Sequence, residues 1–243
     1  MDYSFLQCGE GALTVHLGDG IDPAINRRVT ALQGAIDSAG LRGITDLIPA
    51  YADLTVCYDC TVISAKALQR QLRRLLDSLS VAGQDRRRVF RLPVCYGGDY
   101  GPDLDFVCHH SGLSAQEVIA LHSAPDYLIY MLGFLPGFAY LGGLDPRLHT
   151  PRLDSPRTCI PAGSVGIGGA QTGVYPLASP GGWQLLGRTP VSVFDRQRQE
   201  PILYRAGDLV HFVPISSAEY EEIARAVAAG TYTVQVEEVP VCD

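Results

Sequence analysis

The sequence predicts an α+β protein in which a small α/β N-terminal domain, residues 1–91, precedes a β-barrel domain, residues 92–243. Strand and helix patterns alternate up to Arg91, whereas short strands and glycine turns dominate beyond Asp126. The charge balance also changes near Arg91, because residues 1–91 carry 11 basic and 10 acidic side chains while residues 92–243 carry 8 basic and 16 acidic ones. Many short strands with few helices favour a closed or nearly closed barrel for the second domain.

In the first domain, strands are expected at residues 12–17, 54–63 and 89–95. The first helix opens at Asp22 and Pro23, where a capping residue precedes a proline, and ends at Gly40. The second helix begins at Ser64 and directs leucines to one face and arginines to the other. This β-α-β-α-β order is typical of a small sheet that is covered by helices on one face.

The second domain is expected to begin with a turn-rich linker, residues 97–102, and a short helix at residues 103–110. Two further helices are marked by capping boxes, in which a serine is followed three residues later by a glutamate. These pairs are Ser114 with Glu117 and Ser216 with Glu219. A terminal strand is expected at residues 234–239.

Residues 127–144 form an uncharged stretch that is nearly long enough to cross a bilayer. Pro136 and four glycines would leave backbone groups unpaired in lipid, so we expect a buried strand, residues 127–134, followed by a tight loop. The N-terminus lacks a basic segment followed by an apolar one, and seven cysteines, an odd number, are typical of reduced thiols. We therefore expect a cytoplasmic protein with no membrane contact.

The composition limits the classes of partner and chemistry. A net charge of −7 and an isoelectric point near 5.3 disfavour nucleic acid as a partner. The only lysine, Lys66, has no glycine beside it, which excludes a phosphate-binding P-loop. Cys57 and Cys60 form a C-x-x-C pair but lack a second pair of ligands, so no metal site is predicted.

Glycine and proline are concentrated in residues 133–187, which hold 12 of the 26 glycines and 7 of the 16 prolines. Glycine lets the backbone approach a ligand closely, although tight barrel corners would explain the same glycines. The few polar side chains in and beside this region are suited to orienting a small polar ligand. They are Ser164, Gln171, Thr172, Tyr175, Ser179 and Arg188. Arg152 and Arg157 are either carboxylate ligands or ordinary surface arginines.

His122 is the histidine whose position is most informative. It lies late in a predicted helix, just before the strand that leads into the first glycine loop. One interpretation is a histidine that caps the helix C-terminus. The other is a group at the rim of a pocket that handles protons or binds substrate.

Several long motifs together resemble one family. They are YMLGFLPGFAYLGG at residues 130–143, PAGSVGI at 161–167, QTGVYP at 171–176, SPGGW at 179–183 and GRTP at 187–190. These segments are similar to the KipI/PxpB family, also called allophanate hydrolase subunit 1. The resemblance implies a small α/β N-terminal domain and a cyclophilin-like β-barrel C-terminal domain.

The resemblance also implies a function. Bacterial members act as the B-type subunit of an ATP-dependent 5-oxoprolinase, together with a KipA-like and a LamB/YcsF-like subunit, and the complex opens 5-oxo-L-proline to L-glutamate. The alternatives are an inhibitor that binds a sensor histidine kinase, and a subunit related to urea or amide carboxyltransferases. ATP would be a co-substrate of the complex, no metal is predicted in this chain, and the isolated chain is expected to be inactive.

Opening a lactam requires donors near the carbonyl oxygen, an anchor for the substrate carboxylate and a group that handles protons. We assign Gln171, Thr172 and Ser164 to the first task as hypotheses. Arg188 or Arg152 would anchor the carboxylate. His122 would handle protons.

Overall fold

The computed structural model describes residues 3–79 and 86–240. The chain divides into two compact units between Asp85 and Arg86. The boundary that the sequence suggested, at Arg91, falls inside a strand of the second unit. Each unit has its own hydrophobic core.

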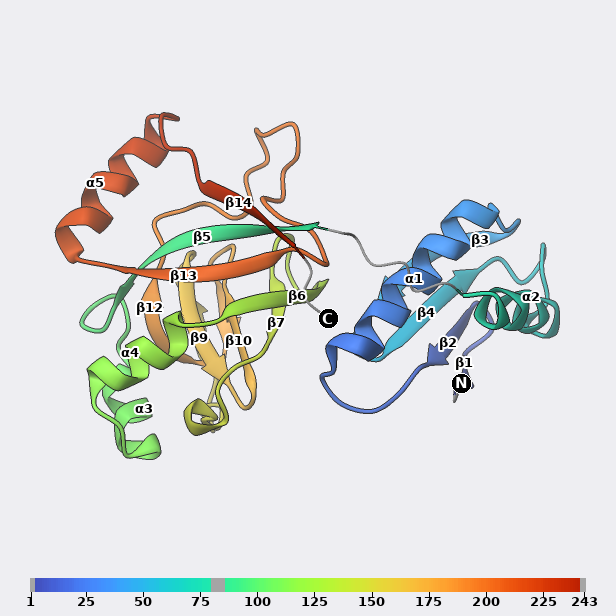
Figure 1. Cartoon of the computed structure of the whole chain (residues 1–243), viewed down its shortest axis with the longest axis horizontal. Coiled ribbons are helices and arrows are strands. Elements are labelled where there is room, and N and C mark those ends of the chain that lie inside the picture. The colour runs from blue at the N-terminus through green and yellow to red at the C-terminus, as the bar shows by residue number, and fades with distance from the viewer. Residues whose placement is uncertain (1–2, 80–85, 241–243) are drawn as a thin grey trace. The chain divides into compact units, whose positions relative to one another are not determined.

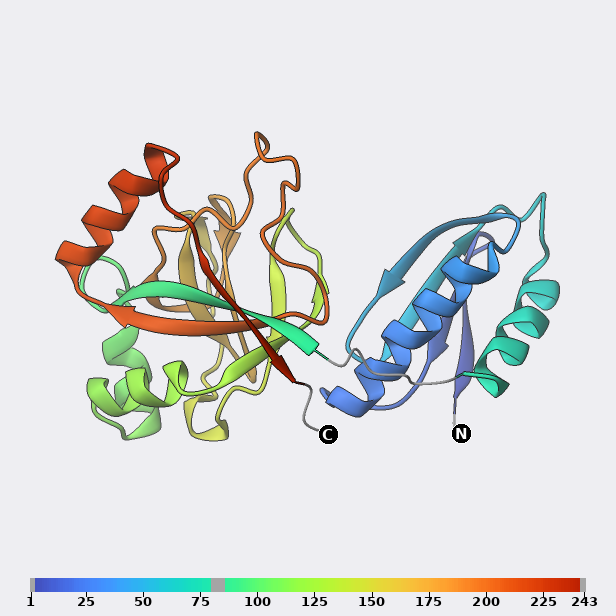
Figure 2. The ribbon, with the colours of Figure 1, turned by 45° about the horizontal axis from the view of Figure 1, so that its top comes forward.

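The first unit is a four-stranded antiparallel sheet with two helices on one face (Figure 2). The strand order is β1-β2-β4-β3. Its elements are β1 (Ser4–Cys8), β2 (Ala12–His16), α1 (Pro23–Ala39), β3 (Ile44–Pro49), β4 (Asp53–Tyr58) and α2 (Ala65–Asp77). Alternate residues of β2 and β4, such as Leu13 and Val56, meet the buried faces of both helices in a single core.

Both predicted helices of this unit are confirmed, and their ends have the expected causes. The Asp22 side chain accepts hydrogen bonds from the backbone N–H groups of Ala24 and Ile25 at the start of α1. Gly40 ends that helix in the left-handed conformation, with a φ of +55°. The Ser64 side chain caps α2 by accepting from Ala67 N–H.

The prediction that residues 89–95 form the last strand of the first domain is wrong. They lie in β5 (Arg86–Tyr96), which pairs with β13 and β14 of the second unit. The first unit instead completes its sheet with β1 and β3, which the strand patterns did not indicate. The β run expected at residues 54–63 ends at Tyr58.

The described part of the second unit, residues 86–240, contains a β-barrel flanked by three α-helices (Figure 1). Its helices are α3 (Leu104–Ser111), α4 (Ala115–Ser123) and α5 (Ser217–Ala228), with a short 3₁₀ turn, η1 (Pro146–Leu148). Its strands after β5 are β6 (Asp126–Leu132), β7 (Ala139–Gly142), β8 (Arg157–Ile160), β9 (Ser164–Gly168), β10 (Gln171–Val174), β11 (Ser179–Gly181), β12 (Gln184–Arg188), β13 (Leu209–Ile215) and β14 (Gln235–Pro240).

The barrel closes because β12 and β5 pair with each other at the ends of one continuous sheet. The order is β12-β9-β10-β7-β6-β13-β5, and the β12–β5 pairing joins its two ends. Seven of the described strands therefore form a closed ring, with β14 added to the outside edge of β5 and with β8 and β11 forming a separate two-stranded sheet. The predicted α+β class, with a small α/β domain followed by a β-barrel, is confirmed.

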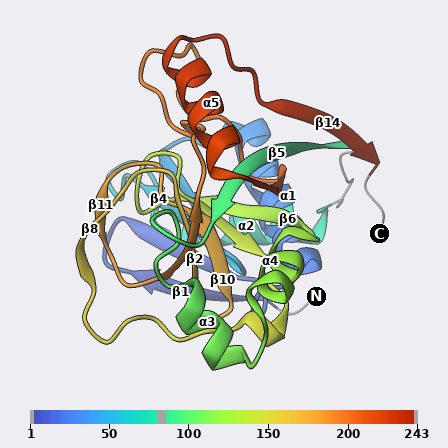
Figure 3. The ribbon, with the colours of Figure 1, turned by 90° about the vertical axis from the view of Figure 1, so that its left-hand side faces the viewer.

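The helices of this unit form where the capping boxes indicated. In both α4 and α5 the serine side chain accepts from the backbone N–H of the glutamate three residues later, and the glutamate side chain accepts from the serine N–H. Figures 1 and 3 show α5 on one side of the barrel and the α3–α4 pair on another. No helix in the described residues is long and apolar enough to span a bilayer.

Two layers of apolar side chains lie on the two faces of the barrel wall. The interior is filled by a cluster that includes Leu92, Ile129, Leu141 and Phe212. A smaller cluster lies against the wall from outside, and the β8–β11 sheet contributes to it. Its fully buried members are Phe138, Ile160, Tyr175, Trp183 and Leu185.

Candidate functional site

A pocket of about 330 Å³ opens on the outer face of the barrel, beside the smaller apolar cluster. It lies among the glycine- and proline-rich segments that the sequence singled out. The side chains that surround it are mainly aromatic. Its lining residues are Phe134, Phe138, Tyr140, Arg152, Pro156, Tyr175, Pro180, Gly181, Gly182 and Trp183.

Strand alternation explains why aromatic residues reach this pocket from a barrel strand. Ala139 and Leu141 of β7 belong to the interior cluster, while Phe138 and Tyr140 belong to the outer one. Successive side chains of a strand point to opposite faces, so the side chains of residues 138–141 alternate between the outer cluster and the interior cluster. The loop before β7 is held by Tyr204, whose hydroxyl donates to the Gly137 carbonyl at 3.0 Å.

Glycines in β9 and β10 make room for the indole of Trp183. A Cβ atom at Gly168 would overlap the indole ring, and one at Gly173 would lie 3.3 Å from it. Because these positions carry no side chain, the ring lies directly against the strand backbone. Part of the glycine richness therefore builds the floor of an aromatic pocket, in addition to the turns.

Phe138 is the centre of the aromatic cluster. Its ring packs edge to face against Phe134, Tyr140, Tyr175 and Trp183, with centroid separations between 5.1 and 5.5 Å. Tyr175 and Trp183 are also in edge-to-face contact, at 6.0 Å. These contacts fix the orientation of the pocket walls in the absence of a ligand.

Phe134 is the exposed member of this cluster. Its side chain is 63% exposed, although it is a large apolar group. It is also the one residue other than glycine in the described part of the chain that has a positive φ, +67°. Such a conformation costs on the order of 1–3 kcal/mol and persists where the surrounding structure holds it. The turn thus presents an aromatic ring to solvent at the pocket edge.

Arg152 supplies the charge of the pocket. Its Nη2 atom donates to Oε1 of Gln171 at 3.2 Å, and its guanidinium carbon lies 5.9 Å from the centre of the Trp183 ring. Arg152 was predicted as a carboxylate ligand, and Gln171 as a donor near a carbonyl oxygen. The structure brings these two residues together at the pocket.

Thr172 and His122 lie on the other face of the barrel wall. Gln171 and Thr172 are neighbours in β10, so their side chains point to opposite faces, and the Thr172 side chain is fully buried. His122 is 0% exposed and its ring stacks on Phe212 of the interior cluster, with centroids 4.9 Å apart. The predicted place of His122 at the rim of a pocket is therefore wrong, because α4 directs its side chain into the barrel core.

The hydrogen bonds of His122 define its tautomer. Thr172 donates its hydroxyl proton to the Gly166 carbonyl at 3.0 Å, so it accepts from Nε2–H of His122 at 2.8 Å. Nδ1 is then the unprotonated nitrogen and accepts from the Tyr96 hydroxyl at 2.8 Å. Burial lowers the pKa of His122 to about 3, which keeps the ring neutral at physiological pH.

Ser164 and Arg188 occupy a third place. They are paired across β9 and β12, and neither of them lines the pocket. Ser164 is fully buried, and the Arg188 guanidinium lies over the Tyr100 ring, 5.9 Å from its centre. Arg157, the other arginine considered as a carboxylate ligand, donates from Nη2 to Asp103 Oδ1 at 2.6 Å and is neutralised by that contact. The predicted single site therefore separates into three regions.

The aromatic residues of the pocket are the part that sequence reasoning missed. Phe134, Phe138, Tyr140 and Trp183 lie in the glycine-rich motifs, where only polar side chains were predicted as ligand contacts. The alternation of large aromatic with small or aliphatic residues at 138–141 was the available signal. Recognising it requires knowing that both faces of this strand are covered, and that depends on the β8–β11 sheet.

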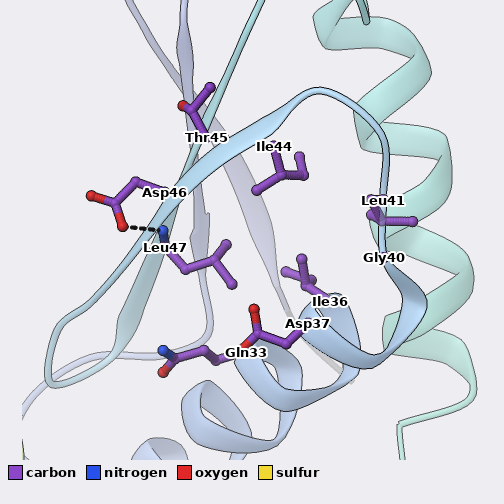
Figure 4. Close-up of a pocket in the computed structure, with 9 residues that line it drawn as sticks. All are labelled: Gln33, Ile36, Asp37, Gly40, Leu41, Ile44, Thr45, Asp46 and Leu47. Atoms are coloured by element: carbon purple, nitrogen blue, oxygen red, sulfur yellow. Dashed lines mark hydrogen bonds between the residues drawn. The ribbon is translucent and has the colours of Figure 1, made fainter.

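A second hollow, of about 420 Å³, lies in the first unit between the end of α1 and β3 (Figure 4). Its lining includes Gln33, Asp37, Thr45 and Asp46. The carbonyl end of α1 and two carboxylates make this hollow unfavourable for an anion. Among the described residues no group of three or more histidine, cysteine, aspartate or glutamate side chains is placed to bind a metal ion.

Comparison with known proteins shows extensive similarity. A family model described as the carboxyltransferase domain, subdomain C and D, matches residues 3–204. A Bacillus subtilis protein named as the B-type subunit of 5-oxoprolinase is 42% identical over 228 residues, which cover 90% of this chain and 95% of that protein. The Escherichia coli O157:H7 protein of the same name is 46% identical over 208 residues, covering 85% and 93%.

The fold has a counterpart in a much larger enzyme. The structure of the Kluyveromyces lactis urea amidolyase superimposes with a TM-score of 0.83 over 98% of this chain, which is 16% of that protein. The sequences are 23% identical, so this likeness concerns the fold. Both units of the present chain are thus matched within one larger polypeptide.

Proposed function

Because the chain belongs to the family of carboxyltransferase subdomains C and D, we propose that it works as the B-type subunit of an ATP-dependent 5-oxoprolinase. Its partners would be a KipA-like and a LamB/YcsF-like subunit, and the complex would open 5-oxo-L-proline to L-glutamate. The observation that carries this proposal is the identity of 42% and 46% to proteins named as that subunit of 5-oxoprolinase, over nearly their whole length.

The proposed reaction includes a phosphoryl transfer for which this chain carries no P-loop. Transfer of a phosphoryl group from ATP to the lactam oxygen would make an imidate-like electrophile and ADP. Water would add to its carbon, and breakage of the C–N bond would leave a glutamyl phosphate. A second water would then hydrolyse this acyl phosphate to L-glutamate and phosphate. The sequence has no P-loop, and its single lysine, Lys66, lies in α2 of the first unit. ATP would therefore not be held by a P-loop of this chain, and the chain would supply a substrate-facing surface of the complex.

The deeply buried candidates fit positioning roles better than contact with substrate. His122 and Thr172 are enclosed in the barrel and satisfy one another by hydrogen bonding. Thr172 links β10 to the Gly166 carbonyl of β9. This network would hold β10, the strand that also carries Gln171, in the geometry that the pocket needs.

Reconstitution tests the proposed function directly. The three purified subunits should release L-glutamate from 5-oxo-L-proline when ATP is present, with ADP formed in equal amount. Mixtures that lack this chain, or this chain alone, should release none. Release of glutamate without this chain, or no release from the complete mixture, would show that the proposal is wrong.

A further inference from the structure

We propose that the aromatic pocket on the outer face of the barrel binds a small carboxylate with a compact, uncharged ring, through Arg152. Given the proposed function, on which this identification rests, the ligand is 5-oxo-L-proline. The proposal concerns the pocket that is lined by the aromatic cluster around Phe138 and by Arg152.

The charge of the pocket selects an anion. Of the described residues that line it, Arg152 alone is charged. Arg152 forms no ion pair with any described residue, in contrast to the arginines of the same unit that are matched by carboxylates. Those pairs are Arg86 with Glu238, Arg88 with Asp208, Arg91 with Glu237, Arg147 with Asp145 and Arg157 with Asp103.

Gln171 prepares the guanidinium for a planar acceptor. Its Oε1 atom accepts a hydrogen bond from Nη2 of Arg152, which limits rotation of the Arg152 side chain next to Trp183. A guanidinium has five N–H donors in a fixed plane, so others remain for a ligand. A carboxylate matches this geometry with two parallel hydrogen bonds.

The walls select the body of the ligand. Aromatic side chains of Phe134, Tyr140 and Trp183 offer apolar surface and ring edges, and no acidic side chain among the described residues lines the pocket to balance a cation on the ligand. A volume of about 330 Å³ suits a small molecule rather than a peptide segment. A five-membered lactam with one carboxylate meets both conditions.

The same chemistry distinguishes substrate from product. Opening the lactam creates an ammonium group and a second carboxylate, whereas the described lining holds a single cationic side chain, Arg152, and no acidic one. Binding the product would bury a second carboxylate without a matching cation, which is unfavourable. The pocket is therefore expected to bind the closed ring in preference to L-glutamate, which favours release of product.

Trp183 provides a direct measurement, because it is the only tryptophan of the chain and lines the pocket. We would titrate the full chain with 5-oxo-L-proline and follow the tryptophan fluorescence. Two matched ligands separate the contributions: 2-pyrrolidinone has the lactam ring without the carboxylate, and L-glutamate is the opened product. Saturable quenching by 5-oxo-L-proline is expected, with at least about 10-fold weaker binding of both other ligands.

Variants test the residues that carry the proposal. R152Q should weaken binding of 5-oxo-L-proline at least about 10-fold, and R152K should restore part of it because it keeps the charge but loses the paired geometry. F134A, at an exposed position, should weaken binding without unfolding the chain. R225Q removes the same charge from an exposed position on α5 and should bind like the parent.

The outcomes separate this inference from the proposed function. If the reconstituted complex is active and R152Q keeps the KM of the parent, the pocket proposal is wrong while the function stands. If the chain binds 5-oxo-L-proline through Arg152 but the complete complex releases no glutamate, the pocket stands and the function does not. A Trp183 signal that responds to one of the partner proteins and to no carboxylate would identify this surface as an interface between subunits and overturn the proposal.

Discussion

Replacing His122 by glutamine should flatten the dependence of barrel stability on pH under mildly acidic conditions. The ring is enclosed in the barrel interior, and burial lowers its pKa from 6.5 to about 3. A histidine whose pKa falls on folding contributes stability that is fully present above the unfolded-state value of 6.5. This contribution is lost as the pH falls toward 3, because the unfolded chain then binds a proton that the folded chain excludes.

The size of the effect follows from the two pKa values. Between about pH 7.5 and pH 5, linkage predicts a loss of about 2 kcal/mol in the free energy of unfolding from His122 alone. In the glutamine variant this part of the slope disappears. The variant is expected to be less stable than the parent by about 1–3 kcal/mol at neutral pH. Glutamine lacks the ring that stacks on Phe212 and that holds its two nitrogens between Tyr96 and Thr172. The difference between the two proteins should therefore shrink in acid.

Denaturant unfolding followed by Trp183 fluorescence measures this quantity, since Trp183 reports on the barrel unit. A suitable control is His16→Gln in the first unit. There a hydrogen bond with Asp53 raises the pKa, so the contribution has the opposite sign, and the barrel transition should keep the slope of the parent. If the His122 variant retained the full slope of the parent between these pH values, the argument from burial would be refuted.

Three further substitutions test how the barrel unit is held together. Gly101→Ala should destabilise the barrel by several kcal/mol or prevent its folding, because the new Cβ would overlap the Leu186 carbonyl oxygen. Thermal unfolding of the purified variant measures this loss of stability. A melting temperature equal to that of the parent would contradict the prediction. Asp103→Ala should lower the free energy of unfolding by about 3–5 kcal/mol, since it leaves Arg157 without its carboxylate in a mostly buried contact. A loss below about 1 kcal/mol in denaturant unfolding would show that the ion pair contributes little. Ser216→Ala removes the N-terminal cap of α5 and should lower the free energy of unfolding by about 1 kcal/mol. An unchanged denaturation midpoint would argue against a role for the capping box.

The helices were the part of the fold that the sequence predicted best. Their signals are local: Asp22 and Ser114 cap the helices that follow them, and Gly40 ends one where a left-handed residue is needed. The assignment of β5 failed for the opposite reason. Its apolar run identifies a strand, but the sheet that a strand joins is decided by partners more than a hundred residues away, as in the pairing of Val89 with Leu209.

The candidate site shows a similar division. Arg152 and Gln171 were predicted and lie together at the pocket. Thr172 was assigned the same task as Gln171, yet neighbours in a strand direct their side chains to opposite faces of the barrel wall. His122 was assigned from its place near a helix end, and only the direction of α4 shows that it enters the core.

The position of β5 in the barrel has a consequence for synthesis of the protein on the ribosome. All strands of the first unit lie within residues 4–58, so that sheet can form soon after its segment emerges. The barrel begins with β5, but both long neighbours of that strand, β13 and β14, are made after all the other described strands of the barrel unit. The nascent chain must therefore keep the apolar strands between them soluble until β13 and β14 have emerged, and this interval is when chaperone binding would matter most.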